Sequence, residues 1–113
     1  MEILQWLHRL NHVKDFFILL KREWEGGYYY KIKINLIDQS VLIAKEDNDE
    51  DERNYSYHWQ NKDNQLITRW DNSPYHKDIS THPHHKHLPG RLAESNEMTL
   101  ESVINEIEKL IKS

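Results

Sequence analysis

Apolar and polar side chains alternate through residues 28–37, and this pattern limits the possible folds more than any other part of the sequence. One set of positions holds Tyr28, Tyr30, Ile32, Ile34 and Leu36, while Lys31 and Lys33 lie between them. Successive side chains of a β-strand point to opposite faces, so this spacing produces one apolar face and one polar face. The segment predicts a strand of an antiparallel sheet that packs only one face on a core.

Four other segments also resemble strands: one before the alternating segment, at 14–24, and three after it, at 40–45, 54–60 and 65–71. The pair Gly26-Gly27 precedes the alternating segment, and glycine readily supplies the positive φ angles that a tight hairpin turn requires. Polar turns separate the later segments. Consecutive strands joined by short turns predict a meander of about five strands.

The last two of these segments also predict a cross-strand register, because the polar turn from Asn61 to Asn64 joins them. The expected pairs are Tyr55 with Trp70, Tyr57 with Thr68, Trp59 with Leu66, Ser56 with Arg69, and His58 with Ile67. The aromatic residues of the first three pairs form a core face. The other face, which also holds Asp71, is predicted to be a polar surface.

Two segments predict helices. Between 99 and 112, apolar residues recur at helical spacing, Thr99 can cap the N-terminus and Lys109 and Lys112 lie in the last turn. Ile3, Leu7 and Leu10 predict a short helix over residues 2–10. The expected fold is a single α+β domain over 1–113, in which the C-terminal helix and the short N-terminal helix cover one face of the antiparallel sheet.

We predict no regular structure for two stretches. An acidic loop is expected at 46–53, because Glu46–Glu52 contains six acids and no base; this run leaves 13 acidic against 15 basic residues elsewhere. The segment 72–91 holds all three prolines and five of the eight histidines. A loop of that length in so small a domain is typically functional or disordered.

Composition excludes several classes of protein. The chain has no cysteine, which rules out disulfides, a cysteine-ligated zinc site, a thiol nucleophile and an iron–sulfur cluster. No apolar stretch is long enough for a transmembrane helix, and the N-terminus lacks the order of a signal peptide. We therefore expect a cytoplasmic protein that does not associate with membranes.

The histidine-rich segment allows three interpretations. It is a solvated loop; or it is a metal site, for instance for zinc, formed by His82, His84, His85 and His87; or it performs acid–base chemistry without a metal. In the last case, cleavage of RNA needs a base for the 2′-hydroxyl proton, an acid for the leaving oxygen and a cation for the phosphate. Two imidazoles and an arginine suffice, and an exposed Tyr75 could stack on a base.

Three sequence motifs resemble those of the TumE family of small prokaryotic toxins. They are Tyr-Ser-Tyr-His-Trp-Gln at 55–60, Leu-Ile-Thr-Arg-Trp-Asp-Asn-Ser-Pro-Tyr-His at 66–76 and Thr-His-Pro-His-His-Lys-His at 81–87, and the terminal helix follows them. The resemblance covers about residues 28–112. It implies the toxin half of a type II toxin–antitoxin system whose partner is a small helix-turn-helix antitoxin.

The resemblance and the acid–base interpretation together define the candidate residues. The predicted catalytic residues are His58, Arg69, His84, His85 and His87. The predicted substrate-binding residues are Asn72, Tyr75, His76 and Lys86. We expect RNA as substrate and no cofactor, with a divalent metal such as zinc as the alternative, and a homodimer is compatible with the sequence. A non-catalytic module that binds protein or nucleic acid is the other open function.

Overall fold

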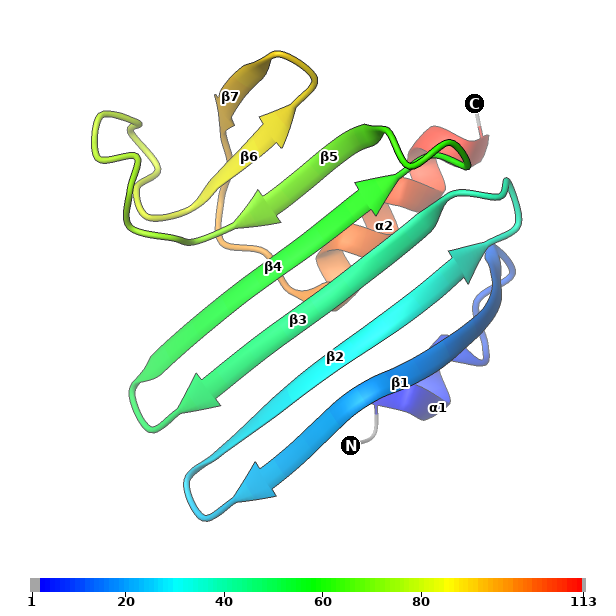
Figure 1. Cartoon of the computed structure of the whole chain (residues 1–113), viewed down its shortest axis with the longest axis horizontal. Helices are drawn as coiled ribbons and strands as arrows, with labels where there is room; N and C mark the ends of the chain where they lie inside the picture. The colour runs from blue at the N-terminus through cyan, green and yellow to red at the C-terminus, as the bar shows by residue number, and fades with distance from the viewer. Residues whose placement is uncertain (1–2, 113) are drawn as a thin grey trace.

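The computed structural model describes residues 3–112 and consists of one antiparallel sheet with two helices (Figure 1). The strands pair in chain order without crossovers. Their bounds are β1 Val13–Trp24, β2 Gly27–Leu36, β3 Val41–Asp49, β4 Glu52–Gln60, β5 Leu66–Asp71, β6 His85–Leu88 and β7 Arg91–Glu94. Helix α1 spans Ile3–Leu7 and helix α2 spans Leu100–Lys112. The α+β class and the meander are confirmed, and β1 and β2 match the predicted strands closely.

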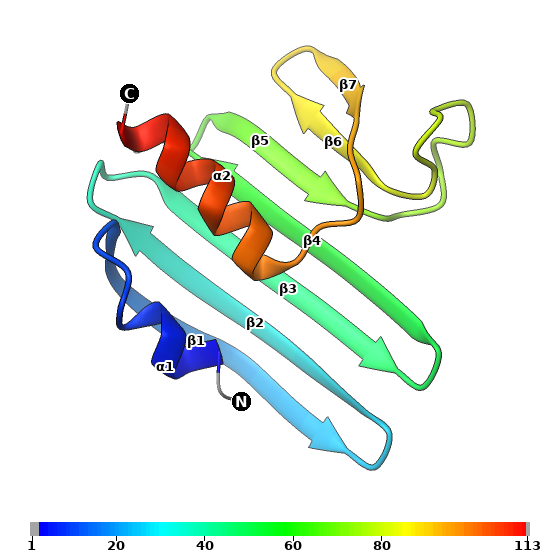
Figure 2. The same cartoon turned by 180° about the vertical axis from the view of Figure 1, so that it is seen from behind.

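Both helices lie on the same side of the sheet (Figure 2). Alternate residues of β2 to β5 point to this side and are buried together with Leu7 of α1 and Leu100, Val103, Ile104 and Ile107 of α2. The predicted helix over 2–10 is shorter than expected, and its residue 2 lies outside the described residues. The opposite side of the sheet carries no helix. We call it the open face.

The sheet has seven strands, so the prediction of about five was too low. The two additional strands, β6 and β7, lie in and just after the segment 72–91, for which no regular element was predicted. Strand β6 was missed because it is polar: His85 and His87 occupy positions that apolar residues usually fill in a strand. The hairpin signal was Pro89-Gly90: Gly90 has φ +75°, as the third position of a type II turn requires.

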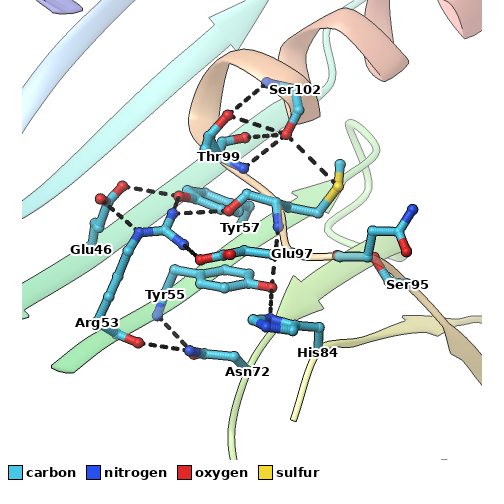
Figure 3. A network of polar contacts seen from close by, with 12 residues as sticks. Glu46, Arg53, Tyr55, Tyr57, Asn72, His84, Ser95, Glu97, Thr99 and Ser102 are labelled. Atoms are coloured by element: carbon cyan, nitrogen blue, oxygen red, sulfur yellow. Dashed lines mark hydrogen bonds and ion pairs between the residues drawn. The ribbon is translucent and has the colours of Figure 1, made fainter. Parts of the chain in front are cut away.

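The predicted acidic loop at 46–53 is also wrong, because β3 continues to Asp49 and β4 begins at Glu52. Strand continuation is possible because Glu46 points to the core side, where its carboxylate accepts four hydrogen bonds; Figure 3 shows those from Arg53 and Tyr57. It accepts bonds from the hydroxyls of Tyr28 (2.5 Å), Tyr30 (2.8 Å) and Tyr57 (3.0 Å), and from Nε of Arg53 (3.0 Å). Burial and the Glu46 carboxylate raise the pKa of Tyr28 to about 12, which keeps this hydroxyl a donor.

The register between β4 and β5 differs from the predicted one by two residues. Tyr57 faces Trp70, His58 faces Arg69 and Trp59 faces Thr68, and an irregularity follows between Trp59 and Gln60. The irregularity leaves Ile67 without a direct partner on β4, whereas the prediction paired it with His58. Because the shift is even, the aromatic core face and the polar face keep their predicted residues. The shift matters for the site, since it places His58 opposite Arg69.

Two smaller observations complete the fold. Gly26 has φ +94° in the β1–β2 turn, which confirms the predicted hairpin. A Cβ at Gly27, the first residue of β2, would lie 2.3 Å from the carbonyl oxygen of Asn48 in β3. The close approach of β2 and β3 therefore requires glycine at this position. No helix within residues 3–112 is long and apolar enough to cross a membrane.

Candidate functional site

Three polar side chains form a row across β4, β5 and β6 on the open face. His58 is directly opposite Arg69, and Arg69 is directly opposite His87. Directly opposed residues of antiparallel strands point to the same face, and neighbouring strands lie about 4.8 Å apart. We call His58, Arg69 and His87 the His–Arg–His row. It places a guanidinium between two imidazoles.

A second row lies beside the first and is centred on Asp71, which is directly opposite both Ser56 and His85. The Asp71 carboxylate contacts Nε2 of His85 at 2.8 Å, Nε of Arg69 at 3.3 Å and Nε2 of His87 at 3.4 Å. Its Oδ1 also accepts a bond of 3.0 Å from the backbone N–H of Ser73. One largely buried carboxylate therefore positions the arginine and two histidines.

Asp71 is ionised in this arrangement. Burial alone would raise the pKa of its carboxyl, but hydrogen bonds from Ser73 and the positive charges of His85 and Arg69 outweigh burial and hold the pKa below its usual value. The Asp71 carboxylate therefore places a negative charge beside the His–Arg–His row.

His76 adds a third imidazole from the segment that connects β5 with β6. Its ring packs edge-on against His85 and His87, with centroids 4.7 and 5.5 Å away, and those two rings are 4.9 Å apart. Each of the three offers a ring nitrogen, and these nitrogens all lie within 4.8 Å of one another. We call His76, His85 and His87 the three-histidine cluster.

His85 is the most enclosed member of this cluster, with an exposed fraction of 0%. Its Nδ1 lies 2.9 Å from the carbonyl oxygen of Pro83, which can only accept, so Nδ1 carries a proton. Its Nε2 faces Asp71 at 2.8 Å, yet the direction of approach is not that of a hydrogen bond and no described residue offers it another partner. The atom closest to the carboxylate is therefore unsatisfied.

The two imidazoles of the row have lowered pKa values. For His58, burial is the main cause, and the positive charge of Arg69 adds to it. For His87, burial also dominates, while Asp71 acts in the opposite direction and His85, His76 and Arg69 add to the lowering. Both rings are thus predominantly neutral at neutral pH and able to accept a proton.

An open pocket of about 360 Å³ adjoins the two rows on the open face. Arg69 and Asp71 form one wall, and Tyr29, Pro74 and Tyr75 supply apolar and aromatic surface. Tyr75 is 83% exposed, so its ring is free to contact a ligand. The volume falls within the range of small-ligand sites, and the lining combines aromatic groups with a few polar ones.

The structure separates other predicted residues from this site. His84 lies on the side of α2, where its Nδ1 shares a hydrogen bond of 2.8 Å with the Tyr55 hydroxyl (Figure 3). Lys86 is opposite Trp70 and therefore points to the core side. Asn72 lines the pocket, but both atoms of its amide bond the backbone of β4, at Tyr55 N and Arg53 O. His82 is exposed and outside the three-histidine cluster.

The predicted metal set is thus rearranged rather than reproduced. Of His82, His84, His85 and His87, the structure brings together His85 and His87, and His76 takes the third place. The central role of Asp71 was also not predicted. The available signal was Arg69-Trp70-Asp71, since residues i and i+2 of a strand share a face and their opposite charges pair.

The fold and site define a small α+β protein with a histidine, arginine and aspartate centre on the open face of an antiparallel sheet. The family model described as toxin TumE matches residues 3–111. The chain therefore belongs to the TumE toxin family, as the sequence motifs indicated. No curated protein and no solved structure matches the chain.

Proposed function

We propose that this toxin is a ribonuclease that cleaves RNA by acid–base catalysis without requiring a metal. The observation that carries the proposal is the His–Arg–His row, because it places two proton-transfer groups on either side of a permanent cation. This is the minimum set that phosphodiester transesterification needs. The toxin class comes from the family; the reaction is inferred from the geometry.

In the proposed reaction, neutral His58 removes the proton of the 2′-hydroxyl, and the 2′ oxygen attacks the adjacent phosphorus. The bond from phosphorus to the 5′ oxygen breaks, and His87 donates a proton to that oxygen. The products are a 2′,3′-cyclic phosphate and a 5′-hydroxyl. Nδ1 of His58 is buried without a hydrogen-bond partner in the described structure, so the proton moves through Nε2.

The second imidazole must be protonated when it acts as the acid, although its pKa is lowered in the free protein. The Asp71 carboxylate lies 3.4 Å from Nε2 of His87 and already favours the imidazolium. A bound phosphate adds a second negative charge beside the ring. The substrate therefore helps to place the catalytic proton on His87.

The surrounding surface suits a single-stranded polyanion. Lys31 and Lys45 are directly opposite each other on the open face, in line with Ser56 and Asp71. Like charges in such positions repel, so they favour an anionic ligand between them. The adjoining pocket offers Tyr75 for stacking of an unpaired base, which is the common mode of single-strand recognition.

The proposed partner is a helix-turn-helix antitoxin encoded beside the toxin. Its binding would protect RNA by covering the open face. Coexpression of the two adjacent genes, followed by size-exclusion chromatography and an RNA cleavage assay, tests this partner. A complex that cleaves RNA as fast as the free toxin would contradict masking of the site.

The proposed chemistry predicts which RNA is cut and which ends form. Untagged protein in excess EDTA should cleave single-stranded RNA to 2′,3′-cyclic phosphate ends, and the same oligonucleotide with a 2′-deoxy residue at the cut site should stay intact, because it has no nucleophile. Mass spectrometry of the products reads both outcomes. Cleavage of the deoxy substrate, or 3′-hydroxyl ends, would contradict the mechanism. Toxicity that survives His58→Ala and His87→Ala would favour non-catalytic binding.

The lowered pKa of His58 can be measured without any substrate. In an NMR titration in EDTA, the His58 ring should titrate below 6.5, the usual value for histidine, because burial and then Arg69 disfavour the imidazolium. In Arg69→Gln the titration should move upward but stay below 6.5, since burial remains. A midpoint at or above 6.5 in the wild type, or no movement in the variant, would contradict this electrostatic coupling.

A further inference from the structure

We propose that His76, His85, His87 and Asp71 form a zinc-binding site, and that zinc bound there inhibits the proposed ribonuclease by occupying His87. The metal site itself stands on the geometry alone. Only its inhibitory effect depends on the proposed function.

The unsatisfied Nε2 atom of His85 is the first argument. Because Nδ1 donates to Pro83, Nε2 either carries a second proton, which makes the ring an imidazolium beside Asp71, or presents a lone pair 2.8 Å from a carboxylate oxygen that has lone pairs of its own. Two acceptors this close need a positive charge shared between them. The side chain is completely buried, so water cannot provide it. A metal ion satisfies both groups, and a proton on Nε2 is the alternative.

The donor set is the second argument. Three imidazoles and one carboxylate are typical zinc ligands, and zinc bonds of 2.0–2.1 Å in tetrahedral geometry place ligand atoms about 3.3 Å apart. Asp71 Oδ1 lies 2.8 Å from His85 Nε2 and its Oδ2 lies 3.4 Å from His87 Nε2, so the carboxylate borders the three-histidine cluster with one oxygen beside each of these two rings. The imidazole nitrogens lie up to 4.8 Å apart, so the longest distance must close by about 1.5 Å. His76 and His87 are only partly buried and can rotate to achieve this.

The surrounding bonds are the third argument. Metal-bound histidines usually donate their second ring N–H to a backbone carbonyl or a carboxylate, which fixes the ring orientation. His85 does so through Pro83, in the absence of any ion. Asp71 is likewise held by the N–H of Ser73. The least mobile ligands are therefore already oriented, and binding needs to order only His76 and His87.

Occupation of this site has a consequence for catalysis. The ring nitrogen that binds zinc uses the lone pair that would otherwise carry the catalytic proton. His87 belongs both to the three-histidine cluster and to the His–Arg–His row, so zinc and proton transfer compete for it. A zinc ion bound to Asp71 would also compete with Arg69 for the same carboxylate.

Isothermal titration of zinc chloride into untagged protein tests the site. We expect one ion per chain and a rise in melting temperature with zinc, because the ion binds the folded state. His76→Ala should weaken binding at least about tenfold, since loss of a ligand costs no less than loss of an outer hydrogen bond. His82→Ala is the matched control, because it removes an exposed histidine of the same segment, and should leave the affinity unchanged. His76 was chosen because replacement of the buried His85 could prevent folding.

The outcomes separate the metal site from the ribonuclease. No zinc binding would overturn the site and leave a protonated His85 paired with Asp71. Equal weakening by His82→Ala and His76→Ala would overturn it in favour of loose chelation by the segment. Zinc binding lost only in His76→Ala supports the site even if no RNA is cleaved, and in that case the proposed function alone fails. If RNA is cleaved in EDTA, zinc added after removal of the EDTA should inhibit the wild type. The zinc concentration that halves each protein's own zinc-free rate should be at least about tenfold higher for His76→Ala; equal concentrations for both would overturn the competition for His87.

Discussion

Replacing Glu46 by glutamine should lower the free energy of unfolding by about 3 kcal/mol, as expected when one partner of a buried ion pair is removed. The amide has a similar shape, but it loses the charge that balances Arg53 and turns one acceptor into a donor. Arg53 also bonds Tyr57, Glu97 and the Met98 carbonyl, so it cannot leave the network. The variant would leave the partly buried Arg53 cation with the exposed Glu97 as its remaining ionic partner, and at least one tyrosine hydroxyl without its acceptor.

Chemical denaturation at neutral pH measures this cost. Glu52→Gln is the matched control, since it makes the same change at an exposed position of the same acidic run and should alter stability by less than about 0.5 kcal/mol. Equal stability of the two variants would show that the network around Glu46 is not coupled to folding.

The stability difference between the wild type and Glu46→Gln should depend on pH. Burial alone would raise the pKa of Glu46, but the bonds from Arg53, Tyr28 and Tyr30 outweigh it and lower the pKa below the ordinary 4.5. The folded state then binds this proton less readily than the unfolded state. The stabilisation is complete above the ordinary pKa and is lost as the pH falls through the lowered one. The stability difference between wild type and Glu46→Gln should therefore shrink in acid; a difference that grows would contradict the assignment.

Glu46 also illustrates what the sequence could not predict. Alternation of apolar residues identified β2 and the aromatic face of β4 and β5, and helical periodicity identified α2, because each pattern is visible within the segment itself. Strand β3 continues through an acidic segment because two tyrosines of β2, and one tyrosine and one arginine of β4, satisfy one carboxylate. Local composition contains no signal for such a contact.

The candidate site shows the same limit. Sequence reasoning placed His58, Arg69 and Asp71 on one polar face, since their parity along the strands is visible. It could not place His85 and His87 beside them, because the position of β6 depends on its pairing with β5 and β7. The register of β4 against β5 was wrong for a related reason. The turn closes one residue later than predicted, with the Asn61 N–H bonded to the Gln65 carbonyl, and the irregularity after Trp59 shifts the pairing by one more residue. Which residues surround Asp71 is therefore decided by how β4, β5 and β6 pair.

Loss of the Arg69 guanidinium should reduce kcat/KM for RNA by about 10²–10³-fold, the usual cost of removing a group that stabilises charge in the transition state. In the proposed reaction, negative charge develops on the phosphate between His58 and His87, and Arg69 is the cation directly between them. Arg69→Lys should recover part of the activity of Arg69→Ala, because an ammonium restores the charge but not the two-pronged geometry.

Initial rates at several RNA concentrations, measured in EDTA, separate this role from simple binding. A transition-state role lowers kcat, whereas loss of electrostatic attraction alone raises KM. Arg91→Ala is the control, since Arg91 is exposed at the start of β7 and should keep the wild-type rate. Folding should survive in Arg69→Ala, because Asp71 keeps its contacts with His85 and Ser73. A folded Arg69→Ala protein that cleaves at the wild-type rate would remove the cation from the mechanism and with it the argument from the His–Arg–His row.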